Sequence, residues 1–204
     1  LKASLEAGEL GWPGALRLHR WTPRGAERWG TPALDPARTG GTAIGALSED
    51  LDLANWFFGG PPNAVFALGR KHASAQLAVY DFVQAHLGFD GGGMALLDYA
   101  MTLPRGDGYF ACAVIGADGA AYADDQANVQ LVYRGGHPAA LNPAPHDAQV
   151  VAALQAFVTA IAQDRDPPVT GADGRLALEV AAAVDASLES GRAARRVGDR
   201  YELV

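Results

Sequence analysis

Alternating apolar and polar residues run through the middle of the chain, between residues 78 and 133. This alternation is the pattern of a β-strand that buries one of its faces. Short turns, such as Gly91–Gly93 and Asp118-Gly119, separate the alternating stretches. Strands that follow one another in this way favour an antiparallel meander. The stretches are 78–89, 94–103, 109–115, 120–123 and 128–133.

Helical periodicity in three other segments sets the rest of the fold. The first runs from Gly40 to Gly59 and ends where Gly59-Gly60 and Pro61-Pro62 stop a helix. The other two, 147–163 and 173–190, carry apolar stripes that we expect to pack on the apolar sheet face. Those stripes are Val150, Leu154, Phe157, Val158 and Ile161, and Leu176, Val180, Val184 and Leu188.

The fold class expected from these patterns is α+β. Two further strand-like stretches, 15–22 and 64–71, join the run described above. We predict one domain over residues 1–204, built on an open, mainly antiparallel sheet of about six strands, with helices on one face. The other face is expected to be free.

Composition excludes several classes of function. The net charge of −7 argues against a non-specific nucleic-acid binder, which needs clustered Lys and Arg. Cys112 is the only cysteine, so no disulfide within the chain and no cysteine metal cluster can form, and its apolar surroundings predict a buried, inert thiol. No metal site is expected. No apolar run spans a bilayer and none resembles a signal peptide, so we expect a cytoplasmic protein.

The free sheet face is predicted to carry a mixed set of side chains. It is too apolar for a simple solvent face and too polar for a core. A subunit interface in a homodimer or homotetramer would account for that mixture. The predicted interface residues are Tyr80, Phe82, Gln84, His86 and Asp98.

The strand at 15–22 is unusual because one of its faces carries Arg17, His19 and Trp21. These side chains could line a polar site, or they could lie on an exposed sheet face. Trp29 follows in a long Gly/Pro-rich loop, and loops of that length are more often functional than idle. The residues alone leave both possibilities open.

Three stretches, in the right order, resemble the C-terminal domain of the Gfo/Idh/MocA family of NAD(P)-dependent oxidoreductases. LKASLEAGELG at the start resembles the family's exit from its cofactor domain. GGTAIGALSEDLDLANWFFGG resembles its Gly-rich entry into the helix that borders the active site. PPVTGADGRLALEVAAAVDASLESGR resembles its closing helix.

The resemblance implies a two-domain enzyme in which a separate Rossmann domain holds NAD(P). The present chain matches only the second domain, which supplies substrate contacts and oligomer contacts. It has no strand followed by GxGxxG, so we expect no cofactor-binding residue here and no activity from this chain alone. Substrates would be sugars, inositols or related polyols.

The helix after Gly40 departs from the family pattern. Aligned on Asp52, Trp56 and Gly59, the family's Asp falls at Gly45 and its His at Glu49. The resemblance therefore gives Glu49 and Asp52 as the candidate catalytic residues, with only Asp52 retained. A glutamate could exchange protons near neutrality only if burial or neighbouring acids raised its pKa.

Two hypotheses follow. The first is the substrate-binding and oligomerisation domain of an oxidoreductase, in which substrate meets Arg17, His19, Trp21, Trp29 and Glu49. The second is a non-catalytic binding or assembly module that uses the open sheet face. A glycosidase is disfavoured, because Glu49 and Asp52 are neighbours on one helix and cannot flank a glycosidic bond.

Overall fold

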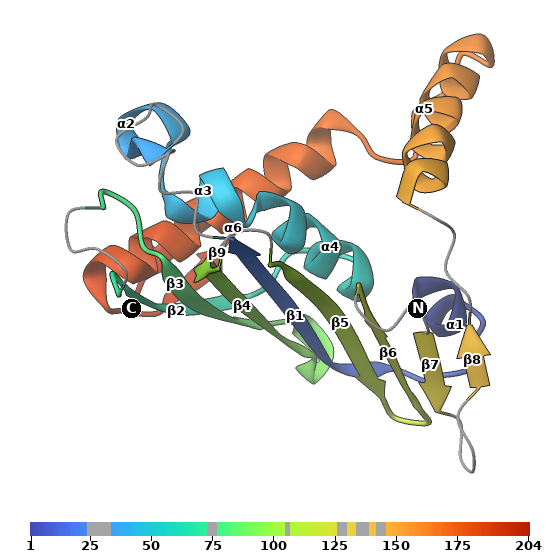
Figure 1. The fold of residues 1–204 in the computed structure, drawn as a ribbon, viewed down its shortest axis with the longest axis horizontal. Helices are drawn as coiled ribbons and strands as arrows, with labels where there is room; N and C mark the ends of the chain where they lie inside the picture. The colour runs from blue at the N-terminus through green and yellow to red at the C-terminus, as the bar shows by residue number, and fades with distance from the viewer. Residues whose placement is uncertain (24–33, 73–76, 105–106, 126–129, 134–138, 142–145) are drawn as a thin grey trace.

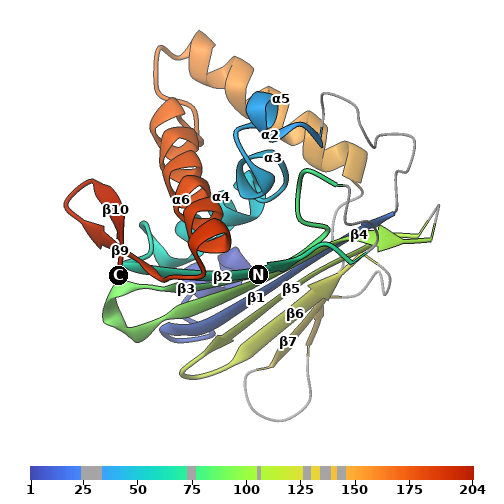
Figure 2. The same cartoon turned by 90° about the vertical axis from the view of Figure 1, so that its left-hand side faces the viewer.

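An open β-sheet with helices along one face forms the centre of the computed structural model (Figures 1 and 2). The structure describes residues 1–23, 34–72, 77–104, 107–125, 130–133, 139–141 and 146–204. The predicted α+β class, open sheet and helix-covered face are confirmed. The strands are β1 (Pro13–Pro23), β2 (Ala64–Arg70), β3 (Phe82–Gly88), β4 (Met94–Leu103), β5 (Tyr109–Gly116), β6 (Ala120–Asp124), β7 (Gln130–Tyr133), β8 (Ala139–Leu141), β9 (Ala194–Val197) and β10 (Arg200–Leu203).

The expected strand number was too low. Within the described residues the sheet has ten strands, in the order β10-β9-β2-β3-β4-β1-β5-β6-β7-β8. Strands β1 to β8 form its body, and the hairpin β9–β10 extends the β2 edge. The extra strands were missed because β8, β9 and β10 span only three or four residues each, too few to establish alternation.

The first strand, β1, lies between β4 and β5, so the predicted meander is interrupted. It pairs parallel with β4, where Leu18 lies opposite Leu97, and antiparallel with β5, where Leu18 lies opposite Cys112. Alternation determines the face on which a residue lies but not the strand beside it, so this insertion was not visible in the sequence. The carboxyl-terminal ends of β1 and β4 consequently lie at the same edge of the sheet.

The helices are α1 (Lys2–Glu6), α2 (Pro36–Thr39), α3 (Thr42–Ala46), α4 (Ser48–Phe58), α5 (His146–Ala162) and α6 (Gly171–Ser190). The segment from Gly40 to Gly59 is two helices and not one, because the backbone bends at Leu47. Gly59 ends α4 in the left-handed conformation that the sequence predicted. Helix α6 begins at Gly171, two residues before its predicted start at Asp173, because Thr170 and Asp173 form a capping box.

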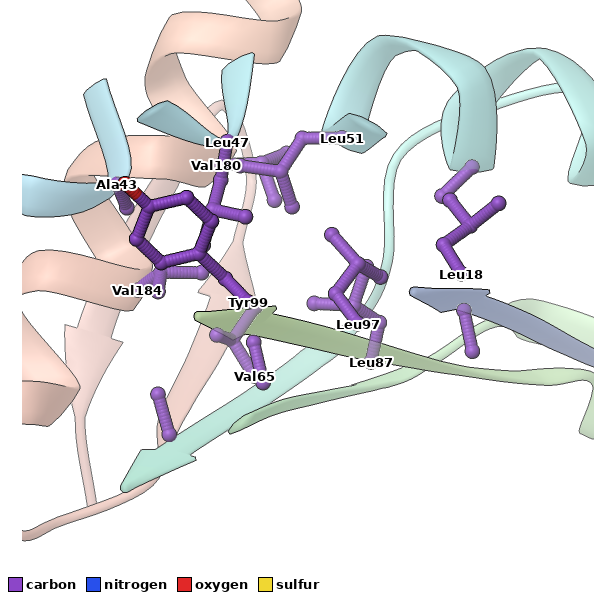
Figure 3. Close-up of a cluster of buried hydrophobic side chains, with 14 of the residues drawn as sticks. Leu18, Ala43, Leu47, Leu51, Val65, Leu87, Leu97, Tyr99, Val180 and Val184 are labelled. Carbon is purple, nitrogen blue, oxygen red and sulfur yellow. The ribbon is translucent and has the colours of Figure 1, made fainter. Parts of the chain in front are cut away.

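The core lies between the sheet and helices α3, α4 and α6. Figure 3 shows Leu18, Leu87 and Leu97 rising from the sheet toward Leu47 and Leu51. Val180 and Val184 enter the same cluster from α6. Burial of these apolar side chains is the main force that holds the helices on this face.

Ser187 connects α6 to the sheet through two hydrogen bonds and is fully buried. Its hydroxyl accepts from the Ala67 N–H (2.9 Å) and donates to the Arg192 carbonyl (2.6 Å). The hydroxyl therefore satisfies one polar group on β2 and another beyond the end of α6. These two bonds explain why a serine occupies this position of α6.

Substituting Ser187→Ala is expected to lower the free energy of unfolding by about 1–3 kcal/mol, because two backbone groups lose their partner. Urea denaturation measures the change. Ser190→Ala is the matched control, since the exposed Ser190 hydroxyl donates to the Ala186 carbonyl and accepts from the Arg192 N–H, and so makes no contact with the sheet. Equal losses in the two variants would contradict the role given to Ser187.

The prediction that both C-terminal helices pack on the sheet is correct for α6 and wrong for α5. Helix α5 makes no substantial contact with another described element, and its apolar stripe is exposed. Both views place it on the helix-bearing side but clear of the sheet (Figures 1 and 2). The sequence pattern gave the apolar side of α5 correctly but could not identify what covers it.

Cys112 is buried within β5, and this burial raises the pKa of its thiol to about 12. The predicted inert thiol is consistent with that environment. No helix in the described part of the chain is long and apolar enough to cross a membrane.

Candidate functional site

A cavity of about 390 Å³ opens on the helix-bearing side, where β1 and β4 end together. Helix α3, with the residue just before it, and the segment before β3 close its other sides. Hydroxyl groups dominate its polar lining, and Arg20 is the one charged residue among the described lining residues. The lining consists of Arg20, Thr22, Pro23, Leu34, Thr39, Gly41, Thr42, Gly45, Ala46, Val79, Tyr80, Tyr99 and Met101.

Arg20 is held in the cavity wall by a buried carboxylate on α4. Its Nε and Nη2 donate to the two oxygens of Asp50 at 2.6 and 2.7 Å. Asp50 is 1% exposed, so burial raises the pKa of its carboxyl, while the guanidinium opposes that rise. The Asp50 hydrogen bonds raise the pKa of Arg20. The pair fixes α4 to β1, and the Arg20 side chain, which is 30% exposed, lines the cavity.

Gly41 lets α6 approach the start of α3 closely. Its φ of 146° is a conformation that L side chains rarely adopt, and a Cβ there would lie 2.2 Å from Asp185 Oδ2. Asp185 accepts from the Ala43 and Ile44 N–H groups at 2.9 and 3.2 Å. Burial raises the pKa of Asp185, and these N–H groups oppose the rise. Gly41, in the glycine pair that opens the segment, therefore leaves room for Asp185 of α6 to cap helix α3.

The cap also bears on cofactor binding. A glycine-rich helix start is where proteins cradle phosphate groups, through N–H groups that point outward. At α3 the Asp185 carboxylate already occupies those N–H groups. The start of α6 is likewise capped by Thr170. These described helix starts do not fit a dinucleotide, and no described group of His, Cys, Asp and Glu could hold a metal ion.

The two predicted catalytic acids, Glu49 and Asp52, lie on α4 outside this cavity. The Glu49 side chain is 84% exposed, and its Oε2 lies 3.5 Å from Arg20 Nη2 at the cavity edge. It lacks the burial that the sequence argument required of a proton-exchanging glutamate. Burial raises the pKa of Asp52, with a further contribution from Asp173. Their catalytic roles stay predictions.

A second cavity, of about 630 Å³, lies between α4 and the start of α6. Glu49 and Asp52 both line it, together with Asn55, Trp56 and Val169. Asn55 is 6% exposed, and neither atom of its amide group has a hydrogen-bond partner among the described residues. No sequence signal had singled out Asn55.

Arg17, His19 and Trp21 point to the opposite, open face of the sheet. Their neighbours Leu16 and Leu18 are the residues that enter the core. The structure therefore does not bring these three side chains together with Glu49, and their contact with a substrate stays a prediction. The charged side chain that β1 presents to the cavity is Arg20, which follows Leu16 and Leu18 at the strand period. Trp29 lies outside the described residues.

On the open face, Asp98 joins the predicted substrate residues to the predicted interface residues. Its Oδ2 lies 3.2 Å from His19 Nδ1 and accepts from Trp21 Nε1 at 2.9 Å. Its Oδ1 accepts from Gln84 Nε2 at 3.4 Å. Phe82, Gln84 and His86 alternate outward from β3, as predicted.

Tyr80 does not share that face. Its hydroxyl donates to the Leu188 carbonyl of α6 at 3.3 Å, and its N–H donates to Thr42 Oγ1 at 3.2 Å. The ring lines the hydroxyl-rich cavity. The alternation fails here because β3 begins only at Phe82, so the strand period does not extend back to Tyr80.

Comparison with known proteins identifies the protein family to which this fold belongs. The model of the GFO/IDH/MocA C-terminal domain matches residues 1–122, more than half of the chain. The protein therefore belongs to the Gfo/Idh/MocA family, as its sequence motifs suggested.

Individual relatives agree with that assignment. The uncharacterized oxidoreductase YrbE of Bacillus subtilis (strain 168) is 29% identical over 203 residues, which cover 94% of this chain and 57% of YrbE. The aldose-aldose oxidoreductase of Caulobacter crescentus, solved with glycerol, is 25% identical with a TM-score of 0.79, over 96% of this chain and 59% of that enzyme.

An oxidoreductase from Agrobacterium radiobacter, solved with NAD⁺, L-tartaric acid and magnesium, has the same fold. Its TM-score is 0.80 at 18% identity, over 95% of this chain and 60% of that one. This chain therefore spans less than two thirds of the length of each of these relatives.

Proposed function

We propose that this chain is the substrate-binding domain of an NAD(P)-dependent oxidoreductase that acts on a neutral polyhydroxylated molecule, such as a sugar, an inositol or a related polyol. The cavity at the joint ends of β1 and β4 carries the proposal. Its hydroxyl groups can accept and donate hydrogen bonds to substrate hydroxyls, and its apolar walls can cover the C–H faces of a ring.

The charges around the cavity favour a neutral substrate over an anionic one. Arg20 is neutralised by Asp50, and Glu49 adds a negative charge beside it. An anion would meet no net positive charge there. The solvated edge of the guanidinium can still donate to a hydroxyl oxygen.

Cofactor chemistry belongs, in this proposal, to a second domain. NAD(P) would accept or supply a hydride at the substrate carbon. The residues of this chain would bind and orient the substrate. Membership of the family and the relative solved with NAD⁺ support this division, as does the filled helix start at α3.

Binding measurements test the proposal directly. Titration of the chain with myo-inositol, D-glucose and glycerol is expected to show saturable binding of at least one. Tyr99→Phe should weaken it by about three- to tenfold, the effect of one hydrogen bond. Tyr122→Phe on the open face is the control and should leave it unchanged. Equal affinities in the two variants would place the substrate elsewhere, and tight binding of NADH to this chain would overturn the assignment of the cofactor to another domain.

A non-catalytic assembly module is the second candidate. It is favoured by Gly45 and Glu49, which stand where the family has Asp and His. The open sheet face would then be the functional surface, and it would form a homodimer or homotetramer in either case. Large exposed apolar side chains lie on it: Leu68 (52%), Phe82 (37%), Met94 (59%), Ile115 (38%) and Tyr122 (42%).

The double substitution Met94→Glu with Ile115→Glu is expected to convert a dimer to a monomer, because it would bury two charges in the proposed interface. Sedimentation velocity at tens of micromolar, about the range where specific dimers persist, measures the change. Leu178→Glu, an exposed leucine on α6, is the control. An unsubstituted protein that sediments as a monomer would argue against the interface.

A further inference from the structure

Two threonine hydroxyls that line the hydroxyl-rich cavity can accept a hydrogen bond from a ligand, but their own protons are engaged. Thr22 Oγ1 donates to the Ala100 carbonyl at 3.3 Å. Thr39 Oγ1 lies 3.2 Å from the Asp35 carbonyl and 3.2 Å from the Gly41 carbonyl, and it donates to one of them. Because a hydroxyl has one proton and two lone pairs, each of these groups presents only an acceptor to a ligand.

The same lining also offers hydrogen-bond donors. Thr42 Oγ1 accepts from the Tyr80 N–H at 3.2 Å, and no acceptor among the described residues takes its proton. The Arg20 side chain, which is 30% exposed, adds the donors of its guanidinium. A ligand that satisfies this lining must therefore bring both donors and acceptors, as a polyol does.

The charge around the cavity distinguishes further between polyols. Charged groups in its wall, at its edge or against a lining residue include the cations Arg20 and Lys71 and the carboxylates Glu49, Asp50 and Asp185. The carboxylates outnumber the cations. A cleft with an excess of negative charge attracts a cation more strongly than a neutral molecule of the same shape.

Glu49 is the carboxylate best placed to meet a cationic ligand. Asp50 is 1% exposed and is bonded to Arg20, and Asp185 is engaged with two N–H groups of α3. The Glu49 side chain is 84% exposed at the cavity edge. Its Oε2 lies 3.5 Å from Arg20 Nη2, and that nitrogen already donates to Asp50 at 2.7 Å. The Glu49 carboxylate therefore keeps lone pairs available to a ligand.

We propose that the hydroxyl-rich cavity also takes polyols that carry a protonated amine, such as amino sugars and aminocyclitols, and binds them more tightly than their neutral counterparts. This inference rests on the proposed function and widens its range of substrates. The ammonium group lies at the cavity edge and donates to Glu49, since an ammonium has three donors and no acceptor. Hydroxyl groups of the ligand donate to Thr22 and Thr39. Other hydroxyl oxygens accept from Thr42 and Arg20.

Titration calorimetry of this chain with D-glucosamine and D-glucose tests the preference. At about pH 6, below the ordinary range for an amine, D-glucosamine should bind about three- to fivefold more tightly, the effect of one exposed ion pair. Glu49→Gln should equalise the two affinities. Sodium chloride at about 0.3 M should reduce the preference of the unsubstituted chain, because salt screens exposed charges.

Glu6→Gln is the matched control and should keep the preference. Glu6 is likewise an exposed glutamate (64%) beside a cation, since its Oε1 lies 4.0 Å from Lys2 Nζ, but it lies on α1 and does not line the cavity.

Four outcomes would count against the amine preference. Equal affinities for the two sugars would reject it, and the proposed function would stand if Tyr99→Phe still weakens glucose binding. A preference that Glu49→Gln leaves intact would assign the effect to the overall negative charge of the protein. Equally tight binding of n-propylamine, which has no hydroxyl group, would mean a cation site that does not use the cavity. Absence of binding by both sugars would reject the proposed function and this inference with it.

Discussion

Replacing Arg20 with methionine is expected to lower the free energy of unfolding by about 3 kcal/mol at pH 7. The substitution leaves the carboxylate of Asp50, which is 1% exposed, without the guanidinium that pairs with it. Breaking a buried ion pair costs about 3–5 kcal/mol. The lower end applies here because the Arg20 side chain is still 30% exposed to solvent. Guanidinium chloride unfolding measures the change.

The loss should depend on pH. Burial raises the pKa of Asp50 above its value in the unfolded chain, and removing Arg20 takes away the opposing effect. A carboxyl with a raised pKa stabilises the fold below its unfolded pKa, and this contribution disappears as the pH rises through the folded pKa. The Arg20→Met variant should therefore lose less stability near pH 4, about the unfolded pKa of Asp, than at pH 7.

The double variant Arg20→Met with Asp50→Leu is the control. It removes both charges and fills the site with apolar atoms, so it should recover most of the lost stability. If it is as unstable as the single variant, lost packing of Arg20 on Phe110, 5.2 Å from the ring centroid, outweighs the electrostatic cost. A loss of stability in Arg20→Met that does not change with pH would lead to the same conclusion.

Replacing Gly41 with alanine is expected to cost about 2–4 kcal/mol, from backbone strain and a displaced cap together. The new Cβ would lie 2.6 Å from Asp185 Cγ, so the carboxylate must leave the Ala43 and Ile44 N–H groups. Because α3 also forms a wall of the hydroxyl-rich cavity, polyol binding should weaken with stability. Thermal unfolding and ligand titration measure the two effects.

Gly174→Ala is the matched substitution. A Cβ at Gly174 meets nothing within 4 Å, and the residue lies in helix α6. It should be neutral or stabilise the protein by up to about 1 kcal/mol, since alanine is the better helix former. If Gly41→Ala proves as harmless as Gly174→Ala, the cap from Asp185 does not determine how α3 is placed.

The candidate site could be predicted only in part. The motif after Gly40 identified the helices that border it. Gly45 and Glu49, where the resemblance expects Asp and His, lie in the cavity wall and at its edge, respectively. Arg17, His19 and Trp21 drew attention as polar residues on a strand, yet the charged residue that faces the cavity is Arg20. The alternation held that information, because Arg20 follows Leu16 and Leu18 at the strand period. Asn55 carried no signal, since its lack of a hydrogen-bond partner among the described residues depends on its surroundings in the fold.

Local periodicity by itself determined the class of fold, the faces of β3 and β4 and the apolar side of each long helix, while the resemblance of three sequence stretches indicated the family. These depend on residues close together in the chain, which share one repeating geometry. The tertiary structure alone decided that β1 lies between β4 and β5, that Asp185 caps α3 and that Asp50 holds Arg20. Each of these joins residues far apart in the sequence. Such contacts depend on packing and electrostatics and produce no repeating pattern in the sequence. The exposed stripe of α5 shows both limits together: its pattern gave the apolar side, and only the fold showed that this domain leaves it uncovered.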